Sequence, residues 1–313
     1  MILRLLLIPL IAVLAFIALG GALSAMAGSP PLRGRLIDVG DGRRRHIICE
    51  GPTGHGPTIV FEAGAFGFSA DWGAVQQMAT AQGWHSCAYD RAGMGLSDPG
   101  DNAHDAIAVT ADLHNLLALA GETGPYILVG HSMAGIYLPL YAKRWPDEVA
   151  GLVLCDATTR VATTMGHTSA FIDQFTMASR MAALASSVGA FKLVQGKYGD
   201  RIGLPPAAKA EKRHAFASAN HNRTAYEEVK AWPVAAQQMV DAGPLDPSLP
   251  VSVITAGPAA PGRDGRKSTQ AAPAEASRHG YYKNVETADH RTLLGLNHGQ
   301  EIIAGIAKVR AAL

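Results

Sequence analysis

The chain has 313 residues, a formal net charge of +1 and only 17% charged side chains. A chain of this length can bury a large core, either as one domain with an insertion or as two smaller domains. The near-neutral charge and the lack of a long basic run argue against nucleic acid as a partner.

The first 27 residues differ in composition from the rest of the chain. Residues 1–19 carry a single charge, Arg4, and the apolar character continues to Ala27. The small residues Ala25 and Ala27 fit the cleavage pattern of a secretory signal. The alternative is an uncleaved membrane anchor, because the stretch approaches the roughly 20 residues that span a bilayer. Residues 1–27 therefore predict either export, to a periplasmic or extracellular location, or membrane association with the main body outside the cytoplasm.

Beyond this segment, short apolar runs alternate with longer helical patterns. Strands are expected at 36–39, 46–50, 58–61, 86–89, 126–129, 151–155, 251–255 and 284–286. Helices are expected at 72–82, 105–120, 136–144, 272–278 and 300–312. Near-continuous apolar strands separated by helices are typical of a parallel sheet that is covered on both faces. Asp41-Gly42 predicts a hairpin turn between the first two strands, and Arg43 to Arg45 are expected to form a solvated strand start.

One long segment interrupts this alternation. Residues 158–247 show no strand pattern, only Ala- and Met-rich helical stretches with Pro205-Pro206 and Trp232-Pro233 as breakers. An insertion of this size between two strands is best interpreted as a helical lid. The expected organisation is a core formed by 35–157 and 248–313, with the lid or cap at 158–247 between its two parts. A separate small domain is the alternative.

The three cysteines, Cys49, Cys87 and Cys155, each fall in an apolar run. Their spacing fits no metal motif. We expect buried free thiols, with one disulfide as the alternative in an oxidising compartment.

A serine lies at a tight turn between a strand and a helix. The sequence Gly130-His131-Ser132-Met133-Ala134 follows the apolar run 126–129 and precedes a helical stretch. Small residues on either side of a serine at such a turn are typical of a nucleophile elbow, where a strained backbone pushes Oγ out of the sheet. Ligands bind beyond the carboxyl ends of parallel strands, so Ser132 is a candidate nucleophile.

A serine hydroxyl needs a base, and an acyl oxyanion needs N–H donors. His290, which follows the last predicted strand by a short turn, is the preferred base, and His298 is the alternative. The N–H groups of Met133 and Ala65 are the expected oxyanion donors. Asp90-Arg91 follow another strand and are expected to brace the surrounding loops.

Several motifs together resemble the α/β-hydrolase fold superfamily, particularly its esterase-like serine hydrolases. They are the segments 130–135, 61–64, 89–98 and 288–290, which resemble the nucleophile elbow, the oxyanion loop, the loop after the fourth strand and the histidine loop. The resemblance implies an α/β fold with a mostly parallel eight-stranded sheet, helices on both faces and a helical lid insertion. Family members usually carry the triad acid after the seventh strand, where the first carboxylate here is Asp264; some carry it after the sixth, where Asp156 stands. Asp156 is preferred over Asp264.

The resulting hypothesis is a carboxylic ester hydrolase that uses Ser132, His290 and Asp156 on a small acyl substrate, with no cofactor and no metal. A serine at the elbow argues against epoxide hydrolysis and dehalogenation, which in this fold use a carboxylate there. The alternatives are an aminopeptidase or carbon–carbon bond hydrolase on the same scaffold, and a non-catalytic binding protein.

Overall fold

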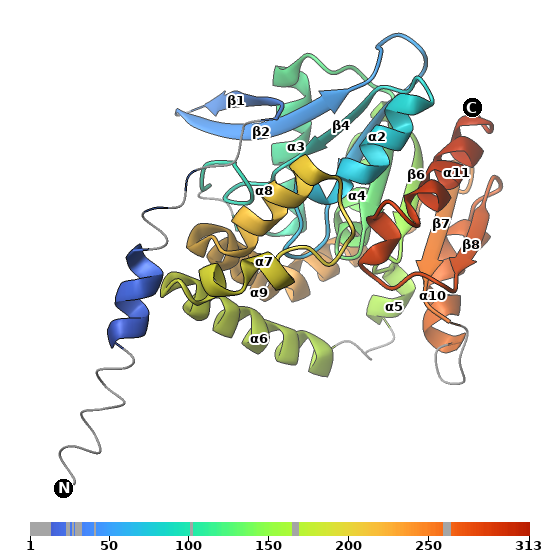
Figure 1. Cartoon of the computed structure of the whole chain (residues 1–313). Coiled ribbons are helices and arrows are strands. Elements are labelled where there is room, and N and C mark those ends of the chain that lie inside the picture. Colours follow the sequence, from blue (N-terminus) through green and yellow to red (C-terminus); the bar gives the residue numbers. More distant parts are fainter. Residues whose placement is uncertain are drawn as a thin grey trace, which may run out of the picture.

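A computed structural model describes residues 14–22, 26, 28, 33–40, 42–100, 103–164, 169–258 and 264–313. The described residues form one eight-stranded sheet in the order β1-β2-β4-β3-β5-β6-β7-β8 (Figure 1). β1 and β2 run antiparallel to their neighbours, and all other pairs are parallel. The strands span Arg35–Gly40, Arg43–Glu50, Thr58–Glu62, Ser86–Tyr89, Tyr126–His131, Val149–Cys155, Val251–Ala256 and Tyr281–Val285.

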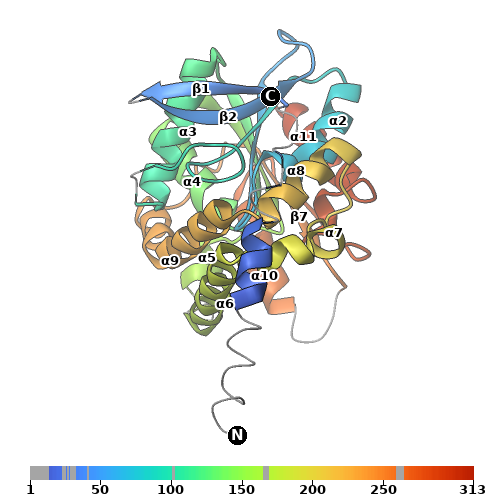
Figure 2. The same ribbon diagram turned by 60° about the vertical axis from the view of Figure 1, so that its left-hand side comes forward.

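Two apolar cores flank the central strands because alternate side chains point to opposite faces. In β5, Ile127 and Val129 join the core beneath α2 (Gly73–Ala81) and α11 (Gly299–Arg310). Tyr126 and Leu128 join the core beneath α3 (Ala106–Ala120) and α4 (Ala134–Arg144). Figure 2 shows these helix pairs on opposite sides of the sheet. Burial on both faces explains why the central strands are almost entirely apolar.

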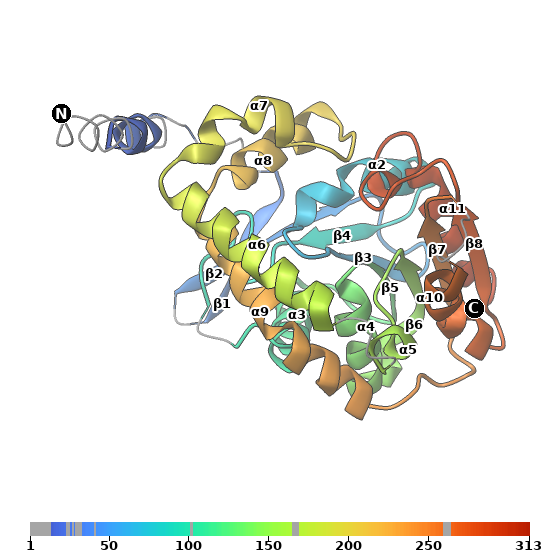
Figure 3. The ribbon, with the colours of Figure 1, turned by 90° about the horizontal axis from the view of Figure 1, so that it is seen from below.

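The described residues between β6 and β7 contain helices and no strand. These helices are α5 (Arg160–Thr164), α6 (Ser169–Ser187), α7 (Gln195–Tyr198), α8 (Pro206–Phe216) and α9 (Ala219–Asp241), with a short 3-10 turn, η3, at Ala190–Leu193. α6 and α9 lie side by side, as seen from below in Figure 3. We call α5–α9 the helical insertion.

Three details differ from the sequence expectations. β8 covers Tyr281–Val285 rather than 284–286. The prediction missed the start of this strand because Lys283 interrupts the apolar pattern. α10 spans Asp264–Ala276 and so begins before the predicted 272, with Pro273 inside the helix. The prediction of a solvated basic cluster is wrong for Arg45, whose side chain is buried with Nε 2.8 Å from Asp112 Oδ2 on α3.

The expectation of three free thiols is also wrong. Cys49 on β2 and Cys87 on β4 are directly opposite each other in the antiparallel pair, and a disulfide joins them. Cys155, at the end of β6, is a buried free thiol. Apolar runs alone could not reveal that two of the three strands are neighbours.

Most of the leader, including Ala25 and Ala27, lies outside the described residues. Residues 14–22 form a helix. Within the described part of the chain, no helix combines the length and apolarity needed to cross a membrane.

Candidate active site

Ser132 occupies a strained turn at the carboxyl end of β5. Its φ is +56°, a left-handed conformation that a side chain disfavours. A Cβ on Gly130 would lie 2.6 Å from Leu138 Cδ1, and one on Gly135 would lie 2.1 Å from the Thr158 carbonyl oxygen. Close packing therefore requires these glycines. Ser132 itself is only half-buried, so a substrate can reach its hydroxyl.

A continuous line of hydrogen bonds runs from Ser132 through His290 to Asp156. His290 Nε2 is 3.0 Å from Ser132 Oγ, and His290 Nδ1 is 2.5 Å from Asp156 Oδ2. Ser132 and Asp156 follow adjacent strands, β5 and β6, whereas His290 comes from the loop after β8. Parallel strands end at one edge, so residues separated by up to 158 positions meet there.

The surroundings of Asp156 keep its carboxylate ionised. Burial alone would raise its pKa, but the hydrogen bond and charge of His290 lower the pKa to about 2. Gln270 Nε2 donates to Asp156 Oδ1 over 3.1 Å from α10. The alternative acid, Asp264, is the first residue of α10, and its side chain lies outside the described part of the structure.

The two predicted oxyanion donors lie on either side of the serine turn. Met133 directly precedes α4, and Ala65 follows Gly64, where an added Cβ would lie 2.8 Å from Ser132 Cβ. Among the hydrogen bonds between described residues, neither the Met133 nor the Ala65 N–H is a donor. Both are therefore available to a ligand oxygen.

A buried arginine braces the loop that carries Ala65. Arg91 donates to the carbonyl oxygens of Ala63 and Gly64 at 2.8 and 2.9 Å. Its guanidinium also pairs with Glu62 at 2.5 Å and with Glu228 of α9 at 2.7 Å. The expectation that Arg91 braces loops is confirmed. Its second partner, Glu228 of the helical insertion, was not predicted. Its neighbour Asp90 pairs instead with His46 at 2.9 Å.

The other histidines near the turn have structural contacts. His131 Nε2 lies 2.7 Å from the His290 carbonyl oxygen, so its neutral ring donates there and holds the His290 backbone. Burial and the nearby His290 lower the His131 pKa to about 3. His298, the alternative base, contacts the Thr292 carbonyl oxygen and Thr287 Oγ1.

Another buried histidine, His221 of α9, links the insertion to the core. Gly95 N–H donates to its Nδ1 over 3.1 Å, and its Nε2 is 3.3 Å from the Phe66 carbonyl oxygen. Burial, reinforced by the charge of Lys212, lowers the pKa of His221 to about 3.

This pKa predicts a specific acid sensitivity. An unfolded histidine has a pKa of about 6.5, so the stability due to neutral His221 is present above pH 6.5 and is lost as the pH falls toward 3. Between pH 7 and pH 5, the unfolding free energy of wild type should fall by about 2 kcal/mol more than that of His221→Asn. Urea unfolding at both pH values measures this. The exposed control His279→Asn should follow wild type, and equal slopes for all three proteins would contradict the prediction.

Aromatic side chains of the insertion cover the Ala65 loop. The Phe66 ring centroid lies 6.0 Å from that of Phe175 on α6, which in turn lies 6.3 Å from the Trp232 ring of α9. Met133 and Trp232 belong to one apolar cluster, against which Ala65 packs. Apolar side chains of the insertion therefore pack against Met133 and the Ala65 loop, next to Ser132.

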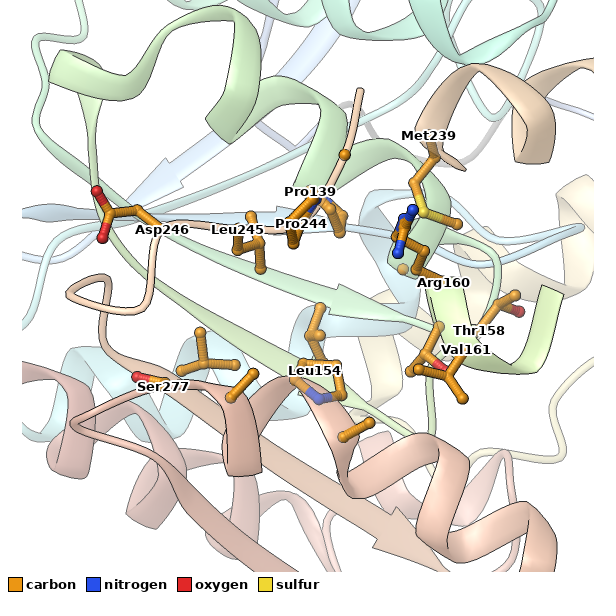
Figure 4. Close-up of a pocket in the computed structure, with 17 residues that line it drawn as sticks. Pro139, Leu154, Thr158, Arg160, Val161, Met239, Pro244, Leu245, Asp246 and Ser277 are labelled. Atoms are coloured by element: carbon orange, nitrogen blue, oxygen red, sulfur yellow. The ribbon is translucent and has the colours of Figure 1, made fainter. Parts of the chain in front are cut away.

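A separate apolar pocket lies between residues of α4, α5, α9 and α10 (Figure 4). It is partly open to solvent, and its lining includes Pro139, Leu154, Val161, Met239 and Leu245. Ser132 and His290 do not line this pocket.

One cluster in the described residues has metal-ligand chemistry. Ligand atoms of Cys49, His85, Cys87 and Glu122 lie within 4.8 Å of one another. Because the two sulfurs are joined in a disulfide, the thiolates that a metal would need are not available.

Sequence reasoning missed three residues that support this site. None of Glu228, Gln270 and His131 was predicted to support the site. Glu228 gives no signal, since it lies beside Glu227 and close to Lys230 in a stretch rich in polar residues. For Gln270 the sequence offers no signal, because only the packing of α10 brings it to Asp156.

Comparison with known proteins agrees with this architecture. A solved structure of a proposed epoxide hydrolase from Pseudomonas aeruginosa superposes with a TM-score of 0.68 at 18% identity, covering 90% of this chain and 98% of that one. A thermophilic esterase from Thermogutta terrifontis gives 0.63 at 20% identity, covering 88% and 98%. At these identities the likeness shows the fold.

Curated relatives match over part of the chain. The sn-1-specific diacylglycerol lipase ABHD11 of Mus musculus is 34% identical over 117 residues, which cover 37% of this chain and 38% of that protein. The curated relatives are matched over only 16% to 40% of their own lengths. The model of the alpha/beta hydrolase family matches residues 59–304, and the chain therefore belongs to that family.

Proposed function

We propose that this protein is a serine esterase that hydrolyses carboxylic esters with an apolar acyl group. The observation that carries the proposal is the hydrogen-bonded line Ser132–His290–Asp156. Ser132 Oγ lies 3.0 Å from His290 Nε2, and His290 Nδ1 lies 2.5 Å from Asp156 Oδ2. A nucleophile, a base and an orienting acid in this arrangement are what acyl transfer to serine requires.

In the proposed reaction, His290 Nε2 takes the Ser132 proton while Oγ attacks the ester carbonyl carbon. The N–H groups of Ala65 and Met133 stabilise the oxyanion that forms. The intermediate collapses, and the alcohol leaves with the proton from His290. Water then attacks the acyl-enzyme with His290 again as base, which releases the acid and restores Ser132. Asp156 holds the His290 tautomer and stabilises its charged form.

The apolar surroundings support an ester rather than a peptide substrate. Phe66, Phe175 and Trp232 offer hydrophobic contact to an acyl chain, and we propose that the insertion acts as a lid over it. An aminopeptidase needs a free carboxylate for the substrate ammonium group, but the buried Glu228 of the insertion is already paired with Arg91. The diacylglycerol lipase and esterase among the similar proteins support the same class.

We also propose that this reaction takes place outside the cytoplasm. The apolar residues 1–27 and the Cys49–Cys87 disulfide both support this location, since disulfides persist in oxidising compartments.

A fluorophosphonate probe tests the nucleophile. Ser132 Oγ should attack phosphorus and displace fluoride, which leaves a stable covalent label that mass spectrometry assigns to Ser132. We expect wild type and the surface control Ser248→Ala to be labelled and Ser132→Ala to remain unlabelled. An unlabelled wild type, or a labelled Ser132→Ala, would refute the proposal.

A substrate panel then tests the bond that is cleaved. We expect kcat/KM for p-nitrophenyl esters to exceed that for amino-acid anilides and to rise from acetate to longer acyl chains. Faster cleavage of the anilides would indicate an aminopeptidase. Cleavage of a 1,3-diketone in preference to the esters would indicate a carbon–carbon bond hydrolase.

A further inference from the structure

The outer side of α6 presents an apolar stripe to solvent. Met177, Met181 and Leu184 are spaced three or four residues apart and therefore lie on one side of the helix. Their exposed fractions are 58%, 57% and 54%. The opposite side of α6 packs on α9 and buries Ile172. Contiguous exposed apolar side chains of this kind mark an interaction surface.

The stripe continues into the N-terminal helix of residues 14–22. Gly20 is buried where this helix meets the end of α6, since an added Cβ would lie 2.2 Å from the Val188 carbonyl oxygen. Figures 1 and 3 show the blue helix beside this end of the insertion. The helix exposes four large apolar side chains, Leu14, Phe16, Ile17 and Leu19. Two apolar surfaces from distant parts of the sequence thus adjoin.

Basic and aromatic groups border this surface. Tyr198 of α7, 38% exposed, lies between Lys197 Nζ and Arg201 Cζ, at 5.3 and 5.2 Å from its ring centroid. Arg180 is exposed on α6, where the exposed acid is Asp173 near the beginning of the helix. Apolar side chains flanked by cations and a tyrosine match the layers of a bilayer interface, where the cations meet anionic headgroups.

We propose that this surface, formed by α6, α7 and residues 14–22, docks on an anionic phospholipid bilayer. Residues 1–19 contain a single charge, and the described helix 14–22 exposes large apolar side chains, which together favour a bilayer over a protein partner. The docked insertion would deliver membrane lipids to Ser132. This substrate class, amphiphilic acyl esters held in the membrane, rests on the proposed function, whereas the docking itself does not.

Vesicle flotation with the full-length chain tests the docking. The vesicles contain phosphatidylcholine and phosphatidylglycerol at 3:1, or phosphatidylcholine alone. We expect wild type to float with the anionic vesicles and to bind the neutral ones more weakly. The triple variant Met177→Glu/Met181→Glu/Leu184→Glu should bind roughly tenfold more weakly or worse, because charged side chains resist insertion.

A matched control places the same charges on apolar side chains elsewhere. Leu119, Tyr282 and Leu296 are 51%, 40% and 50% exposed and lie outside the surface. Their triple glutamate variant should float like wild type. Equal binding by the α6 variant and wild type, equal loss in both triple variants, or self-association without vesicle binding would each overturn the proposal.

Activity on a soluble ester separates the docking from the chemistry. The α6 variant should hydrolyse p-nitrophenyl acetate like wild type but lose activity on an ester embedded in anionic vesicles. An inactive wild type that still floats would refute the esterase and leave the docking intact. An active wild type that does not float would refute the docking alone.

Discussion

Replacement of Asp156 by asparagine is expected to lower kcat on a soluble ester by roughly 10⁴-fold, as loss of the triad carboxylate does in serine proteases. The carboxylate accepts the Nδ1–H of His290, which leaves the Nε2 lone pair facing Ser132. An asparagine amide can instead donate to Nδ1, which places the proton on Nε2 and removes the base. With a pKa of about 2, Asp156 is ionised throughout the usual assay range, so the loss should persist from pH 5 to pH 9.

The matched control is Asp264→Asn, the same change at the other candidate acid. It should retain wild-type kcat. Thermal unfolding should show that Asp156→Asn is folded, since an asparagine oxygen can still accept from Gln270 Nε2. Activity that survives Asp156→Asn but is lost in Asp264→Asn would reverse the assignment of the acid.

Replacement of Arg91 by methionine is expected to reduce the unfolding free energy by about 3–5 kcal/mol. The side chain is buried, and its removal leaves Glu62 and Glu228 without their cation. It also removes the donors to the Ala63 and Gly64 carbonyl oxygens, so kcat should fall together with stability. Urea denaturation and ester hydrolysis on the same preparation measure the two effects.

Arg44→Met is the matched control for the arginine. Arg44 pairs with Asp98 at 3.1 Å, but its side chain is 53% exposed. Water and salt screen an exposed pair, so this variant should be almost as stable as wild type. A similar loss of unfolding free energy in both variants would contradict the prediction, because burial would then not explain the stability that the Arg91 pairs contribute.

The sequence was sufficient to predict the sheet because its signals are local. Apolar runs bounded by turn residues give the central strands, and small residues around Ser132 give the tight turn. The errors arise where a local pattern is incomplete. Lys283 hides the first half of β8, and Arg45 resembles a solvated cation although it is buried against Asp112.

The sequence by itself therefore determined the order of strands and helices, the turn at Ser132 and the preference for His290 as its partner. The tertiary structure decided which carboxylate faces His290, which cysteines are paired and which insertion residues contact the core. Asp156 lies 134 positions from His290, and Arg91 lies 137 positions from Glu228. Such contacts depend on which strands become neighbours and how the helices pack on them, and no pattern within a short window carries that information.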